Sequence, residues 1–402
     1  MPFTRNQKFS LLISLYIAQG LPYGFFTQTL PVLLRVEGVD LKTIGFSSAL
    51  ALPWALKFLW APAVDKYGSR KFWILWSNLI AIACLIGMSF LELPFIVNEA
   101  IVILFAGFFL MNLFTATQDI ATDGLAVNFL AENERGIGNG IQVAGYRVGM
   151  ILGGGLLLSW FTVLGWQYSL WILSGIFFIS TLPVIFFNQR KYSTEQDNLS
   201  FSDFVAFFKL PHLVLWLVII VIYKFGDALG GAMVRPLLVD SGFSIKDIAL
   251  ILGIAGFSAG LLGAIVGGFL VNQLGRYKSL LIFAIIQAFA VAAWALLSIE
   301  SLASTKLIAK PMVYTLSALE HFTGGLATAA LFTAMMDHCR KECAGSDYTI
   351  QACIVVTMTI LASTTSGISA TELGYTLHFV IAGILSLMVF PLIIKYKSYF
   401  VS

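Results

Sequence analysis

Apolar runs long enough to cross a lipid bilayer recur along nearly the whole chain, and this feature limits the possible folds more than any motif does. A membrane-spanning helix needs about 20 mostly apolar residues. Twelve such runs can be placed, at residues 9–34, 43–61, 72–91, 100–122, 138–160, 167–187, 211–236, 247–271, 279–298, 311–337, 348–370 and 374–394. Because helices satisfy their own backbone polar groups inside a bilayer, the pattern predicts an all-α membrane protein with 12 transmembrane helices.

The composition excludes a large water-soluble domain. Hydrophobic residues make up 58% of the 402 residues and charged residues only 11%, whereas soluble globular chains average about 25% charged residues. The net charge of +3 is small, and the basic residues are scattered over short predicted loops, which argues against a nucleic-acid partner. The first apolar run is too long for the core of a signal peptide. We therefore expect a lipid bilayer and a small-molecule substrate as partners.

Most Lys and Arg residues fall in the predicted loops on the same side as the N-terminus. Loops that stay in the cytoplasm carry an excess of these residues. An even number of spans places the two ends of the chain on one side. Both termini are therefore predicted to be cytoplasmic.

Segments of the first half recur in the second half at nearly constant spacing. Residues 31–38 resemble residues 236–242, and residues 65–71 resemble residues 272–278, at offsets of 204 to 207 residues. Repeats with an even number of spans are parallel and are related by an axis along the membrane normal. The sequence thus predicts two six-helix pseudo-repeats, at 1–187 and 211–402, joined by a polar cytoplasmic linker at 188–210.

The repeated loop is a candidate gate. Its first copy, with Asp65, Gly68 and Arg70, resembles the loop between the second and third helices of the major facilitator superfamily. Such pairs could latch one face of the transporter and break when the cavity opens. The alternative is that the bases only follow the positive-inside rule. The predicted gate residues are Lys57, Asp65, Gly68, Arg70, Asn272, Gly275 and Arg276.

Ionisable residues inside the spans are a sharper functional signal, because each is costly in lipid unless it is paired or faces water. Asp119 and Asp123 are four residues apart and share one helix face, so they need a cation or a bound proton, and Lys57 lies at a suitable depth. A structural latch and a proton-coupling site both fit. Arg147 needs an anion, either Asp119 or Glu320 or an acidic group of the substrate.

Two further charged pairs lie in the second half. Lys224 and Asp227 are spaced to pair with each other, which favours a structural role. Glu320 beside His321 is a candidate proton relay, although a neutral buried histidine is the alternative. We interpret Asp337 as a solvated helix cap. The proton-coupling candidates are Asp119, Asp123, Asp227, Glu320 and His321.

Polar and aromatic residues of the first span suggest a substrate cavity. Gly20-Leu21-Pro22 is expected to interrupt the helix and free backbone groups. The predicted cavity residues are Gln19, Tyr23, Gln28, Gln118, Arg147, Tyr223 and Lys224. Cys339 and Cys343 beside His338 lack a full four-ligand set, so we predict no metal site and no cofactor. Without a phosphate-binding G-x-x-x-x-G-K-[ST] motif, energy has to come from an ion gradient.

Several motifs resemble the AmpG and acetyl-CoA transporter group of the major facilitator superfamily. They are Leu52-Pro53-Trp54-Ala55-Leu56-Lys57 with Pro62 and Asp65, Thr117-Gln118-Asp119-Ile120-Ala121-Thr122-Asp123, and Gly145-Tyr146-Arg147-Val148-Gly149-Met150. The chain length is closer to that of a shorter branch, the RhtX/FptX-type siderophore permeases. Two further segments also resemble that branch, Gln19-Gly20-Leu21-Pro22-Tyr23 and Gly138-Asn139-Gly140.

The resemblance implies a proton-coupled secondary transporter that imports a siderophore, with or without iron, across the bacterial inner membrane by alternating access. The alternatives are an AmpG-like muropeptide importer or another organic-anion permease. Rivals of another class are a transporter-like solute receptor and a membrane-embedded acyltransferase. Because no nucleophile–base constellation emerges, we expect no enzymatic activity, and we expect a monomer.

Overall fold

Helices make up almost all of the described chain. The computed structural model describes residues 4–30, 33–34, 37, 39, 50–187, 201–243, 245–298 and 306–397. These residues form two compact units. Unit 1 comprises residues 1–131, 144–204 and 338–353, and unit 2 comprises residues 132–143, 205–337 and 354–402. Each unit therefore contains one segment from the other half of the sequence.

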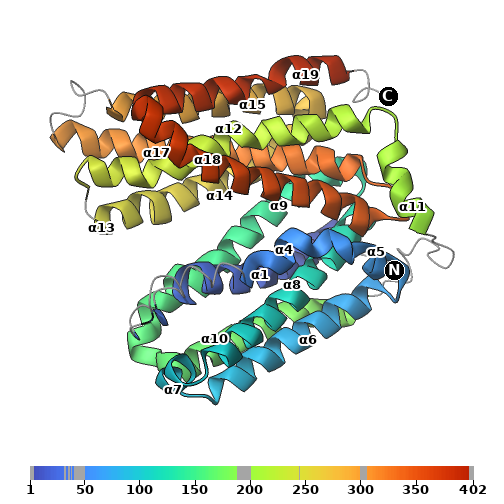
Figure 1. The fold of residues 1–402 in the computed structure, drawn as a ribbon. Helices are drawn as coiled ribbons and strands as arrows, with labels where there is room; N and C mark the ends of the chain where they lie inside the picture. The colour runs from blue at the N-terminus through green and yellow to red at the C-terminus, as the bar shows by residue number, and fades with distance from the viewer. Residues whose placement is uncertain are drawn as a thin grey trace. The chain divides into compact units, whose positions relative to one another are not determined.

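Unit 1 is built from the first six predicted spans. Its elements are α1 (Arg5–Gly24), η1 (Phe25–Thr29), α4 (Leu52–Leu56), η3 (Lys57–Leu59), α5 (Ala61–Lys66), α6 (Arg70–Ser89), α7 (Leu93–Asn98), α8 (Ile101–Phe129), the later part of α9 (Glu132–Ile151), η4 (Leu152–Leu156) and α10 (Leu157–Phe186). Within it, α6 lies beside both α8 and α10 (Figure 1). The core is apolar, with Leu21, Phe25, Phe108 and Leu170 fully buried.

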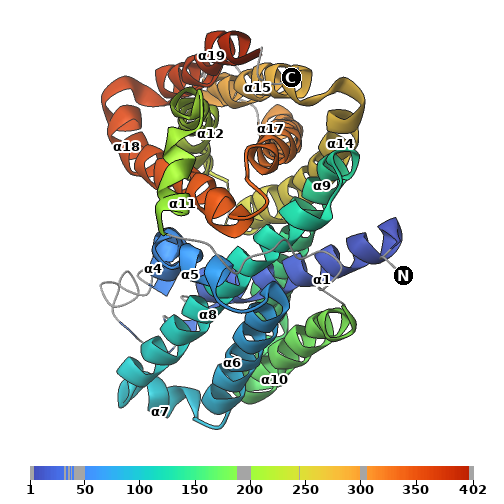
Figure 2. The same ribbon diagram turned by 90° about the vertical axis from the view of Figure 1, so that its right-hand side faces the viewer.

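Unit 2 contains the second half of the predicted spans. Its elements are the start of α9, the end of α11 (Phe201–Ala206), η6 (Phe207–Lys209), α12 (Leu213–Asp240), α13 (Ile245–Ile248), η7 (Ala249–Gly256), α14 (Phe257–Leu274), α15 (Arg276–Ala292), η8 (Ala293–Ser298), α17 (Lys306–Asp337), most of α18 (Ala344–Leu387) and α19 (Val389–Tyr396). Within it, α17 packs against α14 and α15, and α12 packs against α15 and α19 (Figure 2).

The prediction of spanning helices is confirmed in large part. Within the described residues, eight helices are long and apolar enough to cross a membrane, judged by length and composition. One of them, 344–396, contains both the eleventh and the twelfth predicted spans. Within the predicted linker, residues 201–209 are helical, while residues 188–200 lie outside the described part.

The second predicted span is not one continuous helix where it is described. It is divided into α4, η3 and α5. Pro53 and Pro62 each stand in the first turn of a new helix. A proline there lacks the amide donor of a continuing helix and restricts the residue before it. The break puts Lys57 at the start of the short 3-10 turn η3.

Positive-φ glycines recur at matching places in the two halves. Gly68 and Gly275 have φ of 74° and 79° and lie in the two copies of the predicted gate loop. Gly165 and Gly374 have φ of 69° and 73°, and each connects two helices at a sharp bend without a longer loop. Glycine is the residue that adopts this left-handed region without a Cβ penalty. The internal repeat predicted from the gate loop thus extends to the turns at Gly165 and Gly374.

Glycines on α1 and α9 bring two backbones into direct contact. A Cβ atom on Gly149 would lie 2.2 Å from the carbonyl oxygen of Ile17, and one on Gly153 would lie 2.1 Å from that of Leu21. On α1, a Cβ on Gly20 would lie 2.1 Å from the carbonyl oxygen of Tyr146. The expected interruption at Gly20-Leu21-Pro22 is therefore wrong, because α1 continues to Gly24 with Pro22 inside it. Gly20 serves helix packing instead.

We expect Gly149→Ala to destabilise the protein, whereas Gly155→Ala should not. The added methyl at residue 149 meets backbone atoms that cannot rotate away, while nothing lies within 4 Å of the Cβ position at Gly155. Overpacking of this kind costs about 1–3 kcal/mol. The melting temperature of each detergent-purified variant measures the difference. Equal melting temperatures for the two variants would contradict the close contact.

Candidate functional site

A buried cluster of charges lies in unit 1. The ammonium group of Lys57 forms an ion pair with the carboxylate of Asp119, and both side chains are buried. One helical turn along α8, Oδ1 of Asp123 accepts a hydrogen bond from the hydroxyl of Tyr16 at 3.1 Å. The prediction that Lys57 is the cation beside Asp119 and Asp123 is confirmed. This cluster contains two carboxylates and one lysine.

An aromatic group lies beside this cluster in unit 1. The ring of Tyr23 lies 6.2 Å from that of Trp54 and 5.7 Å from that of Tyr146, measured between centroids. The ammonium of Lys57 lies 5.8 Å from the centre of the Trp54 ring. The indole nitrogen of Trp54 donates to Oδ1 of Asn112 at 3.3 Å. Of the predicted cavity residues, Tyr23 therefore belongs to this aromatic group.

The first copy of the predicted gate loop is closed around Asp65. Oδ1 of Asp65 accepts from Nη1 of Arg70 at 2.9 Å and from the amide of Gly345 at 3.2 Å. Oδ2 accepts from the amide of Ser346 at 2.6 Å and from its hydroxyl at 2.7 Å. Asp65 thus caps the N-terminus of α18, where helix amides favour a negative charge. Arg70 and Asp65 are both fully buried.

The second copy of the loop forms a different contact in unit 2. Nδ2 of Asn272 donates to the carbonyl of Asn133 at 2.8 Å, and Nη2 of Arg276 donates to the carbonyl of Glu132 at 2.6 Å. Both carbonyls belong to the start of α9. An aspartate cannot donate a hydrogen bond when ionised, whereas an asparagine can. The side-chain amide of Asn272 can therefore donate to the carbonyl of Asn133, whereas the carboxylate of Asp65 accepts from hydrogen-bond donors.

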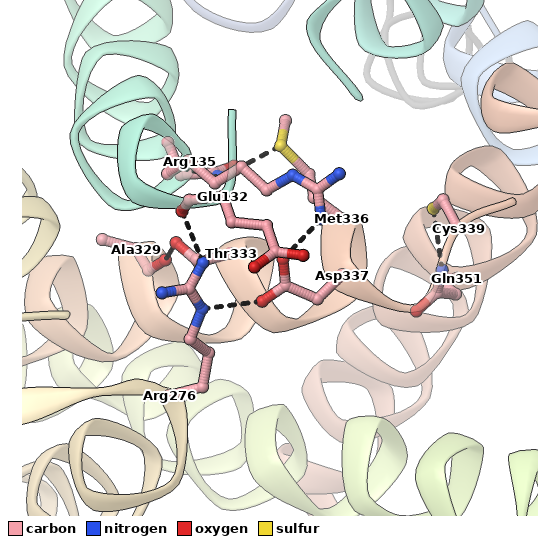
Figure 3. A network of polar contacts seen from close by, with 10 residues as sticks. Glu132, Arg135, Arg276, Ala329, Thr333, Met336, Asp337, Cys339 and Gln351 are labelled. Atoms are coloured by element: carbon pink, nitrogen blue, oxygen red, sulfur yellow. Dashed lines mark hydrogen bonds and ion pairs between the residues drawn. The ribbon is translucent and has the colours of Figure 1, made fainter. Parts of the chain in front are cut away.

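Asp337 joins two arginines in the same region of unit 2. Its Oδ1 lies 2.5 Å from Nη1 of Arg135, and its Oδ2 accepts from Nε of Arg276 at 2.8 Å (Figure 3). The interpretation of Asp337 as only a solvated cap is wrong, because α17 ends where both guanidinium groups converge. The signal in the sequence was the position of a carboxylate at the end of a predicted span, where a buried charge needs a partner.

Arg340 and Asp347 form a further pair in unit 1 that the sequence reading missed. Nε and Nη2 of Arg340 donate to the two carboxylate oxygens of Asp347 at 2.8 and 2.7 Å. This bidentate hydrogen bonding raises the pKa of Arg340 above its ordinary value. The pair fixes the residues that lead from α17 into α18. Arg340 and Asp347 are only seven residues apart, but Arg340 lies in the turn before α18. Helical periodicity therefore does not predict that the two side chains meet.

Unit 2 has its own charged cluster inside the spans. Nζ of Lys224 lies 2.6 Å from Oδ2 of Asp227, which confirms the predicted pair, and it also donates to Thr328 on α17. Nδ1 of His321 lies 2.6 Å from Oε2 of Glu320 and 3.0 Å from the carbonyl of Ser317. A backbone carbonyl can only accept, so Nδ1 carries the proton in the hydrogen bond to Ser317. His321 therefore donates to Glu320, in a geometry compatible with a proton relay.

The other predicted site residues form different contacts. Gln118, next to Asp119, donates to Thr122 within α8. The hydroxyl of Tyr223 on α12 donates to the carbonyl of Leu280 on α15 at 3.5 Å. Arg147 is half-buried directly after Tyr146. The side chain of Gln28 lies outside the described part. No group of three or more His, Cys, Asp and Glu residues suited to a metal occurs among the described residues.

The family follows from comparison with known proteins. The model of the Major Facilitator Superfamily matches residues 12–354. The chain belongs to the major facilitator superfamily. It is 30% identical to the Anhydromuropeptide permease of Escherichia coli strain K12, over 85% of this chain and 70% of that protein. It is 28% identical to the putative transporter AmpG 4 of Rickettsia conorii, over 83% of each.

Solved structures of the superfamily share the fold. The fucose:proton symporter of Escherichia coli superposes with a TM-score of 0.75 at 12% identity, over 98% of this chain and 99% of that one. The human organic anion transporter MFSD10 gives 0.73 at 12% identity, over 97% and 100%. At identities this low, the similarity establishes the fold and does not identify the substrate.

The comparisons confirm the AmpG resemblance and identify a multi-pass membrane transporter. Its relatives are permeases and transporters rather than enzymes. They do not support the expected siderophore or iron import, and they favour the AmpG-like alternative. The closer likeness to RhtX/FptX-type permeases stays a prediction.

Proposed function

We propose that this protein imports anhydromuropeptide-like solutes, an anhydro sugar joined to a short peptide, across the bacterial inner membrane by proton-coupled alternating access. The observation that carries the proposal is the 30% identity to the Escherichia coli permease over 85% of the chain. Both termini are then cytoplasmic, and the gate loops at Asp65 and Asn272 lie on the cytoplasmic side.

Proton coupling is supported by the charge balance of the unit 1 cluster. Lys57 neutralises Asp119, while Asp123 lies one turn away and is only 2% exposed. Two carboxylates buried one turn apart beside one lysine carry a large desolvation and repulsion cost, which binding a proton reduces. Tyr16 donates a hydroxyl hydrogen bond to the Asp123 carboxylate, and a hydroxyl does not supply a compensating charge. We assign the coupling proton to Asp123, with Glu320 of unit 2 as the second candidate.

Uptake into right-side-out membrane vesicles tests both parts of the proposal. The wild type should accumulate radiolabelled anhydromuropeptide when the interior is alkaline, and collapse of the pH gradient should abolish accumulation. Accumulation that persists without the gradient would exclude proton coupling. A receptor that only binds solute would give no accumulation under either condition.

Asp123→Asn should abolish uphill accumulation and retain exchange of labelled for unlabelled solute. The amide keeps an oxygen that can accept from Tyr16 but cannot release a proton. Glu92→Gln is the matched control, because Glu92 is an exposed carboxylate just before α7, and it should accumulate solute as the wild type does. If Asp123→Asn accumulates normally while Glu320→Gln does not, the coupling proton belongs to Glu320.

A further inference from the structure

The rings in the aromatic group of unit 1 meet mostly edge to face. Tyr23 meets Trp54 at an interplanar angle of 80° and Phe26 at 77°. Rings that meet edge to face are not stacked on each other, and aromatic rings of this kind can also stack on a flat apolar partner. Tyr23, Trp54 and Tyr146 are each half-buried, although the neighbouring residues Phe25 and Phe26 are buried. We call Tyr23, Trp54 and Tyr146 the aromatic platform.

Two buried side-chain NH2 groups, on Gln19 and Asn112, accompany the platform. Asn112 presents its oxygen to Trp54, whose indole nitrogen can only donate, so its Nδ2 is the remaining group. Among the described residues, neither Nδ2 of Asn112 nor Nε2 of Gln19 has a hydrogen-bond partner, and these side chains are 0% and 1% exposed. Gln19 precedes Tyr23 by one helical turn and shares its face of α1. Buried donors normally find an acceptor.

The depth of these residues fits a transported solute. Gln19, Tyr23, Trp54, Asn112 and Tyr146 all fall in the middle third of their predicted spans. Solute sites of secondary transporters lie near the bilayer midplane. A solute that matches this surface needs a flat apolar face for the rings and acceptor oxygens at its edge for the amide donors. Pyranose rings with hydroxyl and N-acetyl substituents have both features.

We propose that the aromatic platform, with the amides of Gln19 and Asn112, binds the saccharide part of the transported solute. This inference rests on the proposed function and adds to it the residues that select an amino sugar. Lys57, which lies over the Trp54 ring and pairs with Asp119, places saccharide binding next to the proton-coupling cluster.

Calorimetric binding to the full-length protein in nanodiscs tests the platform with two probes, 1,6-anhydro-N-acetylmuramic acid and the matching free peptide. Trp54→Leu and Tyr146→Leu should each weaken sugar binding about tenfold and leave peptide binding unchanged. Tyr146→Phe keeps the ring and should retain most of the sugar affinity. Trp76→Leu is the control, because Trp76 is an exposed tryptophan of α6 outside the platform.

Each outcome has a distinct meaning. Unchanged sugar affinity in Trp54→Leu and Tyr146→Leu, or no saccharide binding by the wild type, overturns the platform. Equal losses of sugar and peptide binding overturn it as a saccharide site. If the platform variants lose sugar binding but the wild type does not take up anhydromuropeptide, the proposed function fails and the platform stands. Monodisperse gel filtration and an unchanged melting temperature establish that each variant is folded.

Discussion

Replacing Lys57 by Met should abolish transport and lower the stability of the protein more than most substitutions do. The change leaves the buried carboxylate of Asp119, one turn from that of Asp123, without its ion-pair partner. Removing one partner of a buried ion pair costs about 3–5 kcal/mol, because the remaining charge stays uncompensated. The melting temperature of the purified protein and the initial uptake rate in vesicles measure the two effects.

The double variant Lys57→Met/Asp119→Asn is the matched control for this prediction. It removes both charges of the pair, so it should recover most of the lost stability, since replacing a buried pair by neutral residues is often nearly neutral. It should not recover uphill uptake if the pair responds to the proton on Asp123. A single variant that melts at the wild-type temperature would show that Asp119 does not depend on Lys57.

Asp65→Ala is expected to have an effect of similar size through a different mechanism. It strips the buried guanidinium of Arg70 of its carboxylate, and it removes the acceptor for the amides of Gly345 and Ser346 at the start of α18. We expect a loss of about 3–5 kcal/mol and a strong fall in uptake. Thermal unfolding and vesicle uptake provide the measurement.

Two comparison variants make the prediction for Asp65 specific. Lys66→Ala changes the exposed neighbouring residue and should leave stability unchanged. Asn272→Ala alters the repeat-related residue, but it removes only a neutral hydrogen bond to Asn133, so about 1 kcal/mol should be lost. Equal losses for Asp65→Ala and Asn272→Ala would contradict the chemical difference between the two loops.

Residues whose partners are local could be predicted from the sequence. The i, i+3 spacing of Lys224 and Asp227 and the i, i+4 spacing of Asp119 and Asp123 follow from helix geometry alone. Lys57 was matched to Asp119 because the depth of each residue in its span can be counted. Hydropathy predicted an all-helical membrane protein, because the thickness of the bilayer sets the length of each apolar span.

Partners far apart in the sequence could not be predicted in this way. The acceptor role of Asp65 toward Gly345 and Ser346, and the convergence of Arg135 and Arg276 on Asp337, depend on which helix ends meet. Neither depth nor periodicity carries that information. The platform was missed in part because Trp54 and Tyr146 are aromatic residues in apolar runs, where packing is the common role.

The glycine contacts between α1 and α9 have a consequence for how the solute preference of this protein can evolve. Tyr23 and Tyr146 stand on two helices whose separation is fixed by main-chain atoms at Gly20 and Gly149. Exchanges of side chains elsewhere in the bundle therefore cannot widen the gap between the two rings. Homologues with a larger residue in place of Gly20 or Gly149 should therefore transport a different solute.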